Sequence, residues 1–255
     1  MHRFFVPVEN ILMKDGEPWR SRITDKDDLK HAVKALRIEL GEDIELCDIN
    51  GIEYLCEVID VNSDEILCNV ISFEANKRES SIDITLFQGM PKADKLEMII
   101  QKTTELGILN ITPVQMKRSV AKWKDDKSAG KKIERWNRIA FEASKQSKRG
   151  RIPTVNKPLT IGQLKEAISD YDLVILPYEN ESAKGIGEII SSNPTAKKVG
   201  IIIGPEGGFA DEEVAVLSEA GAHSVKLGPR ILRTETAGVV TVALVQYALG
   251  DLGGV

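Results

Sequence analysis

Residues 199–249 read VGIIIGPEGGFADEEVAVLSEAGAHSVKLGPRILRTETAGVVTVALVQYAL, and this stretch decides the fold class. An apolar run, a glycine-rich loop and a helical pattern are followed by a second strand-like run, a second loop and a long apolar helical pattern. Strands that alternate with helices in this way form an α/β domain with a mostly parallel sheet. The strand-like runs are apolar almost throughout, which is typical of strands covered by helices on both faces.

The same alternation extends back to residue 82. Strand-like runs at 82–89, 111–115 and 173–178 alternate with helical patterns at 92–106 and 183–190. The segment before them, EANKRESS at 74–81, is polar and poor in apolar residues, as linkers are. We therefore expect an α/β domain over 82–255, preceded by a linker at 74–81.

The first 73 residues have the pattern of a small β-barrel. Alternating runs flank Asn50-Gly51, which predicts a hairpin because both turn residues tolerate positive φ. A run at 65–73 predicts a further strand, Phe4 to Val6 opens the domain as a strand, and 28–36 has a short helical pattern. Closely spaced strands separated by turn residues favour a small barrel over 1–73.

Three loops follow three of the apolar strands, at 177–180 (PYEN), 204–209 (GPEGGF) and 227–237 (LGPRILRTETA). Ligands bind at the carboxyl ends of strands in open α/β sheets, so we expect these loops to meet at one pocket. GPEGGF has no Gly-Lys-Ser/Thr and no G-x-G-x-x-G pattern, and Glu206 would repel a phosphate. The loop suits ribose hydroxyls or a cationic ligand better, with a simple capped turn before Asp211 as the alternative.

The third loop mixes apolar and charged residues in a way that fits neither a surface turn nor a core. A buried charge must be paired or used, and an apolar loop can form the wall of an adenine site. Arg233 and Glu235 are therefore candidates for a reaction centre, with a purely structural ion pair as the alternative.

Several motifs that follow one another in a fixed order indicate a protein family more specifically than any single loop does. GMPKADKLEMIIQKTTELGI (89–108), EASKQSKR (142–149), LPYE (176–179), IIIGPEGGF (201–209) and LGPRILRTETA (227–237) together resemble the RsmE family, and HRFF at the N-terminus also fits. Enzymes of this family methylate N3 of one uridine, U1498 by convention, in the 16S ribosomal RNA of the small ribosomal subunit. The resemblance covers most of residues 82–250.

The resemblance implies a SPOUT-type methyltransferase domain with a C-terminal trefoil knot, a PUA-like N-terminal barrel and a homodimer. It also implies S-adenosylmethionine as cofactor, bound inside the knot. The motif match gives a set of cofactor-binding residues: Leu176, Pro177, Gly204, Glu206, Gly207, Gly208, Leu227, Gly228, Ile231, Leu232 and Ala237.

Uridine N3 carries a proton and is a poor nucleophile until that proton is lost, so the enzyme must supply a base or stabilise the anion. Our hypothesis is that Arg233 stabilises charge on the uracil carbonyls and that Glu235 orients Arg233 or accepts the N3 proton. Bracing of the knot by an Arg233–Glu235 pair is the structural alternative.

The net charge of −5 conceals a basic block. Residues 117–151 hold 13 lysines and arginines against four acids, a net +9, whereas the rest of the chain carries −14. A local basic block favours a polyphosphate partner, although a solvated helix face has the same composition. The predicted RNA contacts are Arg3, Arg22, Lys92, Lys95, Arg118, Lys145, Arg149 and Arg151.

Other classes of protein and site are disfavoured. No run approaches the roughly 18 apolar residues of a membrane helix, no secretory signal is evident, and the scattered histidines indicate no metal. Cys47, Cys56 and Cys68 form no CxxC pair and fit a reducing, cytosolic location. Two alternatives stay open: a SPOUT enzyme acting on a ribose 2′-hydroxyl or on transfer RNA, and a non-catalytic ribosome-assembly factor. A nucleotide-phosphate enzyme is disfavoured by Glu206 and the missing lysine.

Overall fold

The computed structural model describes residues 1–124 and 129–253 and divides into two compact units. Unit 1 comprises Met1–Glu79 and Ser144–Arg151, and unit 2 comprises Ser80–Ala143 and Ile152–Val255. The sequence had assigned Ser144–Arg151 to the second domain. These residues group with unit 1 because its acids hold them, as the ion pairs Lys145–Asp28 and Arg149–Glu79 show. The domain boundaries read from the sequence otherwise stay a prediction.

Unit 1 is built on a six-stranded sheet in the order β1-β4-β5-β6-β3-β2. β1 and β4 are parallel, and the other neighbours are antiparallel. The predicted hairpin is confirmed: β4 and β5 pair across a turn in which Gly51 has a φ of 75°. The strands are β1 (His2–Val6), β2 (Ile11–Lys14), β3 (Glu17–Ile23), β4 (Asp43–Asp48), β5 (Ile52–Val61) and β6 (Ile66–Ala75).

The helical stretch predicted at 28–36 begins two residues earlier and changes type. Asp25 caps α1 (Lys26–Lys30) by accepting from two backbone N–H groups, and the chain continues as the π-helical segment η2 (His31–Leu36). A short 3-10 turn, η1 (Val8–Asn10), precedes β2. The hairpin of β2 and β3 had not been predicted, because its strands are short, charged and interrupted by Pro18.

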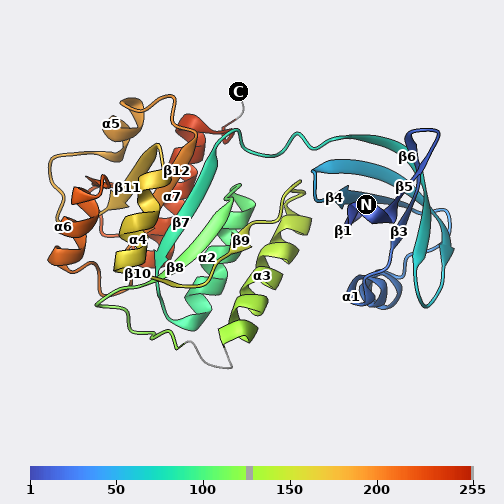
Figure 1. Ribbon diagram of the computed structural model, residues 1–255, viewed down its shortest axis with the longest axis horizontal. Helices are drawn as coiled ribbons and strands as arrows, with labels where there is room; N and C mark the ends of the chain where they lie inside the picture. The colour runs from blue at the N-terminus through green and yellow to red at the C-terminus, as the bar shows by residue number, and fades with distance from the viewer. Residues whose placement is uncertain (125–128, 254–255) are drawn as a thin grey trace. The chain divides into compact units, whose positions relative to one another are not determined.

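Unit 2 confirms the predicted α/β class (Figure 1). Its seven-stranded sheet runs β10-β8-β7-β12-β11-β13, with β9 also paired to β8, and every pair is parallel. The strands are β7 (Asp83–Gly89), β8 (Asn110–Gln115), β9 (Thr154–Val155), β10 (Leu159–Thr160), β11 (Leu173–Pro177), β12 (Lys198–Ile203) and β13 (His223–Val225).

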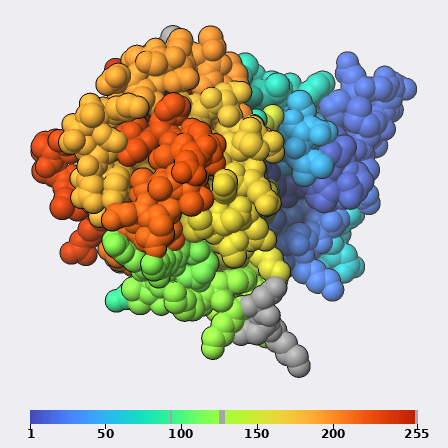
Figure 2. All heavy atoms as spheres, turned by 60° about the vertical axis from the view of Figure 1, so that its left-hand side comes forward, coloured from blue at the N-terminus to red at the C-terminus, as the bar shows by residue number. Residues whose placement is uncertain are grey.

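Helices cover both faces of this sheet, which explains why its strands are apolar throughout. One face packs against α2 (Ala93–Glu105), α3 (Ala129–Gln146), α5 (Ile186–Ser191) and α7 (Thr234–Leu249). The other packs against α4 (Ile161–Ala167), the 3-10 turn η3 (Ile168–Asp170) and α6 (Asp211–Glu219). Figure 2 shows α4 in yellow beside α6 in red-orange at the surface of unit 2. No helix in the described ranges is long and apolar enough to cross a membrane.

The path of the chain in unit 2 is consistent with the predicted trefoil knot. After β13, at the sheet edge, the chain returns as α7 to pack on α2, β7 and β12. The backbone is crowded where β7 and β12 end: a Cβ on Gly89 would lie 2.5 Å from the Pro205 nitrogen. Only glycine allows so close an approach of two chain segments. The three special loops follow β11, β12 and β13 at this same end of the sheet.

Candidate functional site

The three loops line one cavity of about 790 Å³ in unit 2. This volume lies within the usual range for small-molecule sites. The cavity also receives Lys95 from α2, which the sequence reading had assigned to RNA. Among the described residues, Leu176 is the one predicted cofactor residue that does not line it. Leu176 is fully buried in β11, on the face of the sheet that packs against α4 and α6. The predicted residues around the cavity are Pro177, Gly204, Glu206, Gly207, Gly208, Leu227, Gly228, Ile231, Leu232 and Ala237.

The glycines of the GPEGGF loop make room for neighbouring loops. Gly208 has a φ of 69°, and a Cβ there would lie 2.8 Å from Glu179 Oε1. A Cβ on Gly207 would lie 3.0 Å from both the Cβ and the carbonyl oxygen of Arg118. The loop therefore needs glycine for close packing between protein segments as well as for access to a ligand.

A single hydroxyl joins two of the loops. Thr234 donates to the Gly204 carbonyl oxygen at 2.6 Å and accepts from Gln88 Nε2 at 2.8 Å. Gln88 and Thr234 are both buried, at the end of β7 and the start of α7. The contact fixes the glycine-rich loop to the N-terminal end of α7. Neither Gln88 nor Thr234 had been singled out from the sequence, since nothing local shows that they meet.

One wall of the cavity is apolar and accessible. Leu227, Leu232 and Ala237 are half-buried, and Ile231 is 88% exposed. An apolar side chain so exposed beside a cavity gives a flat ring a surface to bind. The adjacent PYEN loop is tied to α6, because Tyr178 donates to Asp211 at 2.9 Å and accepts from Asn180.

Lys95 lies between two carboxylates at the edge of the cavity. Its Nζ is 3.1 Å from Glu235 Oε2 and 3.4 Å from Glu206 Oε1. Glu206 also accepts from the Lys92 backbone N–H at 3.2 Å, which puts a carboxylate at the N-terminal end of α2, where it is favoured. The structure therefore gives Glu206 a role in joining the glycine-rich loop to α2, which the ribose-binding interpretation of the sequence had not included.

The charges around Lys95 are mutually stabilised. Burial raises the pKa of Glu235, but its own backbone N–H and the Lys95 ammonium outweigh burial and hold the pKa below the ordinary value. The pKa of Glu206 is likewise lowered, against burial, by backbone N–H groups and by Lys95. The pKa of Lys95 is raised, chiefly by its contact with Glu235. Both glutamates are thus ionised at neutral pH.

Arg233 does not form the expected pair with Glu235. No ion pair within 4.0 Å joins them among the described residues, and Glu235 meets Lys95 instead. Arg233 is exposed, lines the cavity and precedes the first turn of α7. Its guanidinium and the positive end of α7 give this side of the cavity a positive potential.

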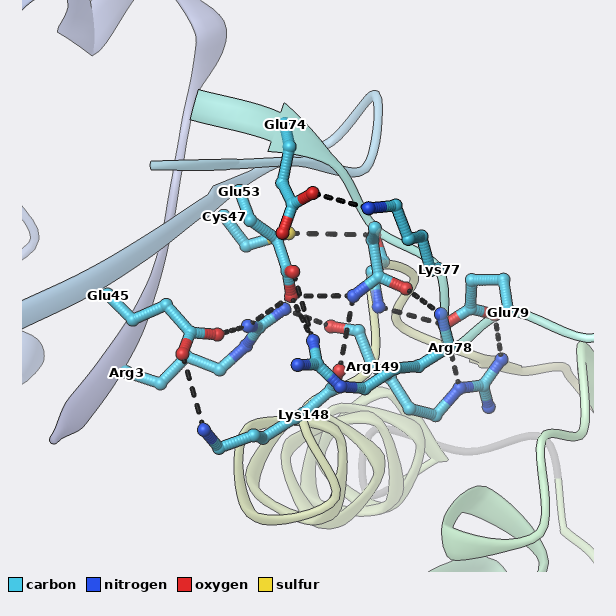
Figure 3. A network of polar contacts seen from close by, with 12 residues as sticks. Arg3, Glu45, Cys47, Glu53, Glu74, Lys77, Arg78, Glu79, Lys148 and Arg149 are labelled. Carbon is cyan, nitrogen blue, oxygen red and sulfur yellow. Dashed lines mark hydrogen bonds and ion pairs between the residues drawn. The ribbon is translucent and has the colours of Figure 1, made fainter. Parts of the chain in front are cut away.

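Two of the predicted RNA contacts, Arg3 and Arg149, belong to an internal network of unit 1 (Figure 3). Arg3 is buried, pairs with Glu45 and, at 2.6 Å, with Glu53, and also donates to the Arg149 carbonyl oxygen. Arg149 is buried and pairs with Glu79 at 2.7 Å. Lys145, outside the network, is buried and pairs with Asp28 at 2.9 Å. We therefore no longer propose Arg3, Lys145 and Arg149 as RNA contacts.

The other predicted RNA contacts differ in their surroundings. Lys92 and Arg151 are exposed, and Arg118 is exposed beside the glycine-rich loop, donating to the Gly207 carbonyl oxygen at 3.4 Å. Arg22 is half-buried and lies 3.9 Å from Glu65. Within the basic block, Lys117, Arg135 and Lys148 also pair with glutamates, so much of its charge is neutralised internally. Residues 125–128 of the block lie outside the described residues.

The three cysteines are buried in unit 1. Cys47, Cys56 and Cys68 are free thiols, and burial raises the pKa of each, to about 11, 11 and 12. Over residues 1–124 and 129–253, no group of three histidines, cysteines or acids could hold a metal ion.

Residues 78–246 match the RNA methyltransferase domain family, and 15–71 match the RNA methyltransferase PUA domain. The chain is 38% identical, over all of its length and 99% of the relative's, to ribosomal RNA small subunit methyltransferase E of Bacillus subtilis.

Two solved structures with bound cofactor are similar over nearly the whole chain. A methyltransferase from Legionella pneumophila in complex with S-adenosylmethionine is 30% identical, with a TM-score of 0.85 over 98% of each chain. Ribosomal RNA small subunit methyltransferase E from Neisseria gonorrhoeae, bound to S-adenosylmethionine, is 27% identical, with a TM-score of 0.83 over 99% of each chain.

Proposed function

Because this chain belongs to the ribosomal RNA small subunit methyltransferase E family, we propose that it methylates N3 of one uridine in 16S ribosomal RNA, U1498 by the family's convention, using S-adenosylmethionine. The observation that carries the proposal is the cavity at the carboxyl ends of β11, β12 and β13. It combines an apolar wall, glycine-rich backbone and the exposed Arg233 in one place.

The residues around the cavity fit S-adenosylmethionine. The cofactor has a flat adenine, ribose hydroxyls and a cationic centre, and no phosphate. Ile231, Leu232 and Leu227 offer the adenine an apolar surface, while Glu179 and Glu181 offer carboxylates to the cationic and hydroxyl groups. When bound there, the cofactor supplies an electrophilic methyl group.

Arg233 and Glu235 have different proposed roles in the reaction. Loss of the N3 proton to a water molecule leaves negative charge on the uracil carbonyls, and Arg233 with the first turn of α7 is suited to stabilise it. Glu235 is a weakened base, because its own backbone N–H and Lys95 lower its pKa against the effect of burial. We therefore assign anion stabilisation to Arg233 and give Glu235 the role of an ionised acceptor that holds Lys95 at the edge of the cavity.

The RNA is proposed to reach this cavity as an unstacked base, since N3 is inaccessible within a helix. Arg118 and Lys92 are exposed predicted phosphate contacts beside the site: the Arg118 guanidinium donates to the Gly207 carbonyl oxygen and the Lys92 backbone N–H donates to Glu206. The predicted homodimer stays a proposal, supported by α7, which is apolar yet leaves Tyr247 exposed. Ribosomal RNA as substrate would put the protein in the cytosol.

Methylation of small ribosomal subunits from a strain lacking the enzyme, followed by identification of the product nucleoside, tests the proposal. We expect 3-methyluridine at one position. A ribose-methylated nucleoside, or product in transfer RNA only, would refute the assigned target. Calorimetry that detects no S-adenosylmethionine binding would instead favour a non-catalytic assembly factor.

A further inference from the structure

The hairpin of β2 and β3 carries an aromatic side chain that the proposed function does not use. Trp19 in β3 is 39% exposed, although tryptophan is usually well buried. The guanidinium carbon of Arg20 lies 4.2 Å from the centroid of its ring, and the Lys14 ammonium nitrogen lies 5.4 Å from it. The ring is therefore held at the surface of unit 1 by two cations.

A β-bulge places Trp19 beside Arg20. Neighbouring residues of a regular strand point to opposite faces, and Ser21 and Ile23 point into the core. The register pairs Leu12 with Arg20 and Met13 with Pro18, so Trp19 is the extra residue of the bulge. The contact between ring and guanidinium shows that the bulge turns Trp19 toward the side that Arg20 occupies.

The cations around the Trp19 ring can contact a ligand, whereas those of the network in Figure 3 are paired with carboxylates. Lys14 and Arg20 have no ion-pair partner within 4.0 Å among the described residues, and Arg22 reaches only Glu65, at 3.9 Å. In the part of the chain that the structure describes, the buried Nε atoms of Arg20 and Arg22 also lack a hydrogen-bond partner. A unit rich in acids thus leaves Lys14 and Arg20 without an ion-pair partner among its described residues, and Arg22 with only a long one.

We propose that Lys14, Trp19, Arg20 and Arg22, together the hairpin platform, bind an unpaired nucleotide of the substrate RNA. The base stacks on the Trp19–Arg20 pair, and Lys14 and Arg22 contact the flanking phosphates. Stacking of this kind accepts any base, so the platform holds single-stranded RNA without choosing the uridine to be methylated. This inference rests on the proposed function in taking RNA as the substrate.

Binding of a fluorescein-labelled oligouridine to the full chain, followed by anisotropy at low salt, tests the platform. We expect Trp19→Ala to weaken binding about tenfold, within the range for one base on one aromatic ring. Trp19→Phe keeps a stacking surface and should retain most of the affinity. Phe73→Ala is the matched control, because Phe73 is exposed on the same unit but no described cation lies over its ring.

A second measurement does not depend on the alanine variant. With Trp123 and Trp136 replaced by Phe, Trp19 is the only tryptophan left, and oligouridine should quench its fluorescence. Lys14→Gln removes a proposed phosphate contact and should reduce the slope of log affinity against log salt by about one. Unchanged oligouridine affinity in Trp19→Ala, or quenching by an acidic peptide in place of oligouridine, would overturn the inference.

The two proposals can fail separately. If the wild-type chain methylates ribosomal subunits but Trp19→Ala binds oligouridine as Phe73→Ala does, only the platform is refuted. If oligouridine binding depends on Trp19 but no methyl transfer occurs, the proposed function is refuted and the platform stands as an RNA-binding site.

Discussion

The Lys95 ammonium lies 3.1 Å from the Glu235 carboxylate and connects helix α2 to the first turn of α7. Replacing Lys95 with Met removes the cation that lowers the pKa of Glu235 and of Glu206. Both carboxyls should then protonate at higher pH, so the acid limb of the pH profile of kcat/KM should move upward. Lys95→Arg keeps the charge and should keep the wild-type limb. A Lys95→Met limb that coincides with the wild type would contradict this role.

Thr234→Val should loosen the cofactor site. The change removes the donor to the Gly204 carbonyl oxygen, at a cost of about 1–3 kcal/mol, and leaves the Gln88 amide with only the Gly89 carbonyl oxygen as acceptor. We expect a higher KM for S-adenosylmethionine and a smaller change in kcat. Thr241→Val is the matched control, because the buried Thr241 hydroxyl donates only within α7, to the Ala237 carbonyl oxygen. Equal effects of the two substitutions would show that the link between the loops is unimportant.

Arg233→Ala should lower kcat about 10²–10³-fold, the effect expected when one group that stabilises developing charge is lost. Cofactor affinity, measured by calorimetry, should change little. Arg230→Ala removes another exposed cation from the same loop and serves as the control. Normal turnover by Arg233→Ala would refute the assigned role.

Arg3→Met should destabilise unit 1 by about 1–3 kcal/mol, because buried Glu45 and Glu53 lose the buried cation they share and keep only the more exposed Lys148 and Arg78. Urea unfolding followed by circular dichroism measures the change. Arg22→Met is the comparison, since its ion pair is long and half exposed. Similar losses of unfolding free energy in the two variants would mean that burial does not strengthen the ion pairs of Arg3.

The stability of unit 1 should also depend on acid pH. Burial raises the pKa of Glu53, but hydrogen bonds from Arg3 and Asn76 lower it below the ordinary value of 4.5. A carboxyl whose pKa is lower in the folded protein than in the unfolded chain stabilises the fold at pH values above its unfolded-state pKa. It loses that contribution as the pH falls through its folded-state pKa. Wild-type stability should therefore fall below about pH 4.5, and Glu53→Gln should weaken this dependence. If the stability of Glu53→Gln fell with acid pH as that of the wild type does, other carboxyls would be responsible for the loss of stability.

The α/β class and the loops of the site could be predicted because their signals are local. Apolar strands covered by helices have a recognisable composition, and glycines after a strand mark a special loop. The hairpin of β2 and β3 was missed because Pro18 and four charged side chains obscure the alternation that identifies a strand.

The partners of charged residues could not be predicted, because they come from distant parts of the chain. Lys95, Lys145 and Arg149 are equally basic in the sequence, yet one lines the cavity and two are buried against acids of unit 1. The sequence also suggested that Glu235 would pair with nearby Arg233, whereas its partner lies in α2. Charge can be read from a sequence, but the solvent exposure of that charge depends on the fold.

The assignment of Ser144–Arg151 to unit 1 limits how the protein can be taken apart. The chain passes between the units at residues 79–80, 143–144 and 151–152, so no single cut yields both units whole. A fragment ending at Glu79 would lack the cations that face Asp28 and Glu79. Supplying residues 144–151 as a separate peptide should restore them. The N-terminal unit is therefore not an independent module that could be exchanged between related enzymes by a fusion after residue 79.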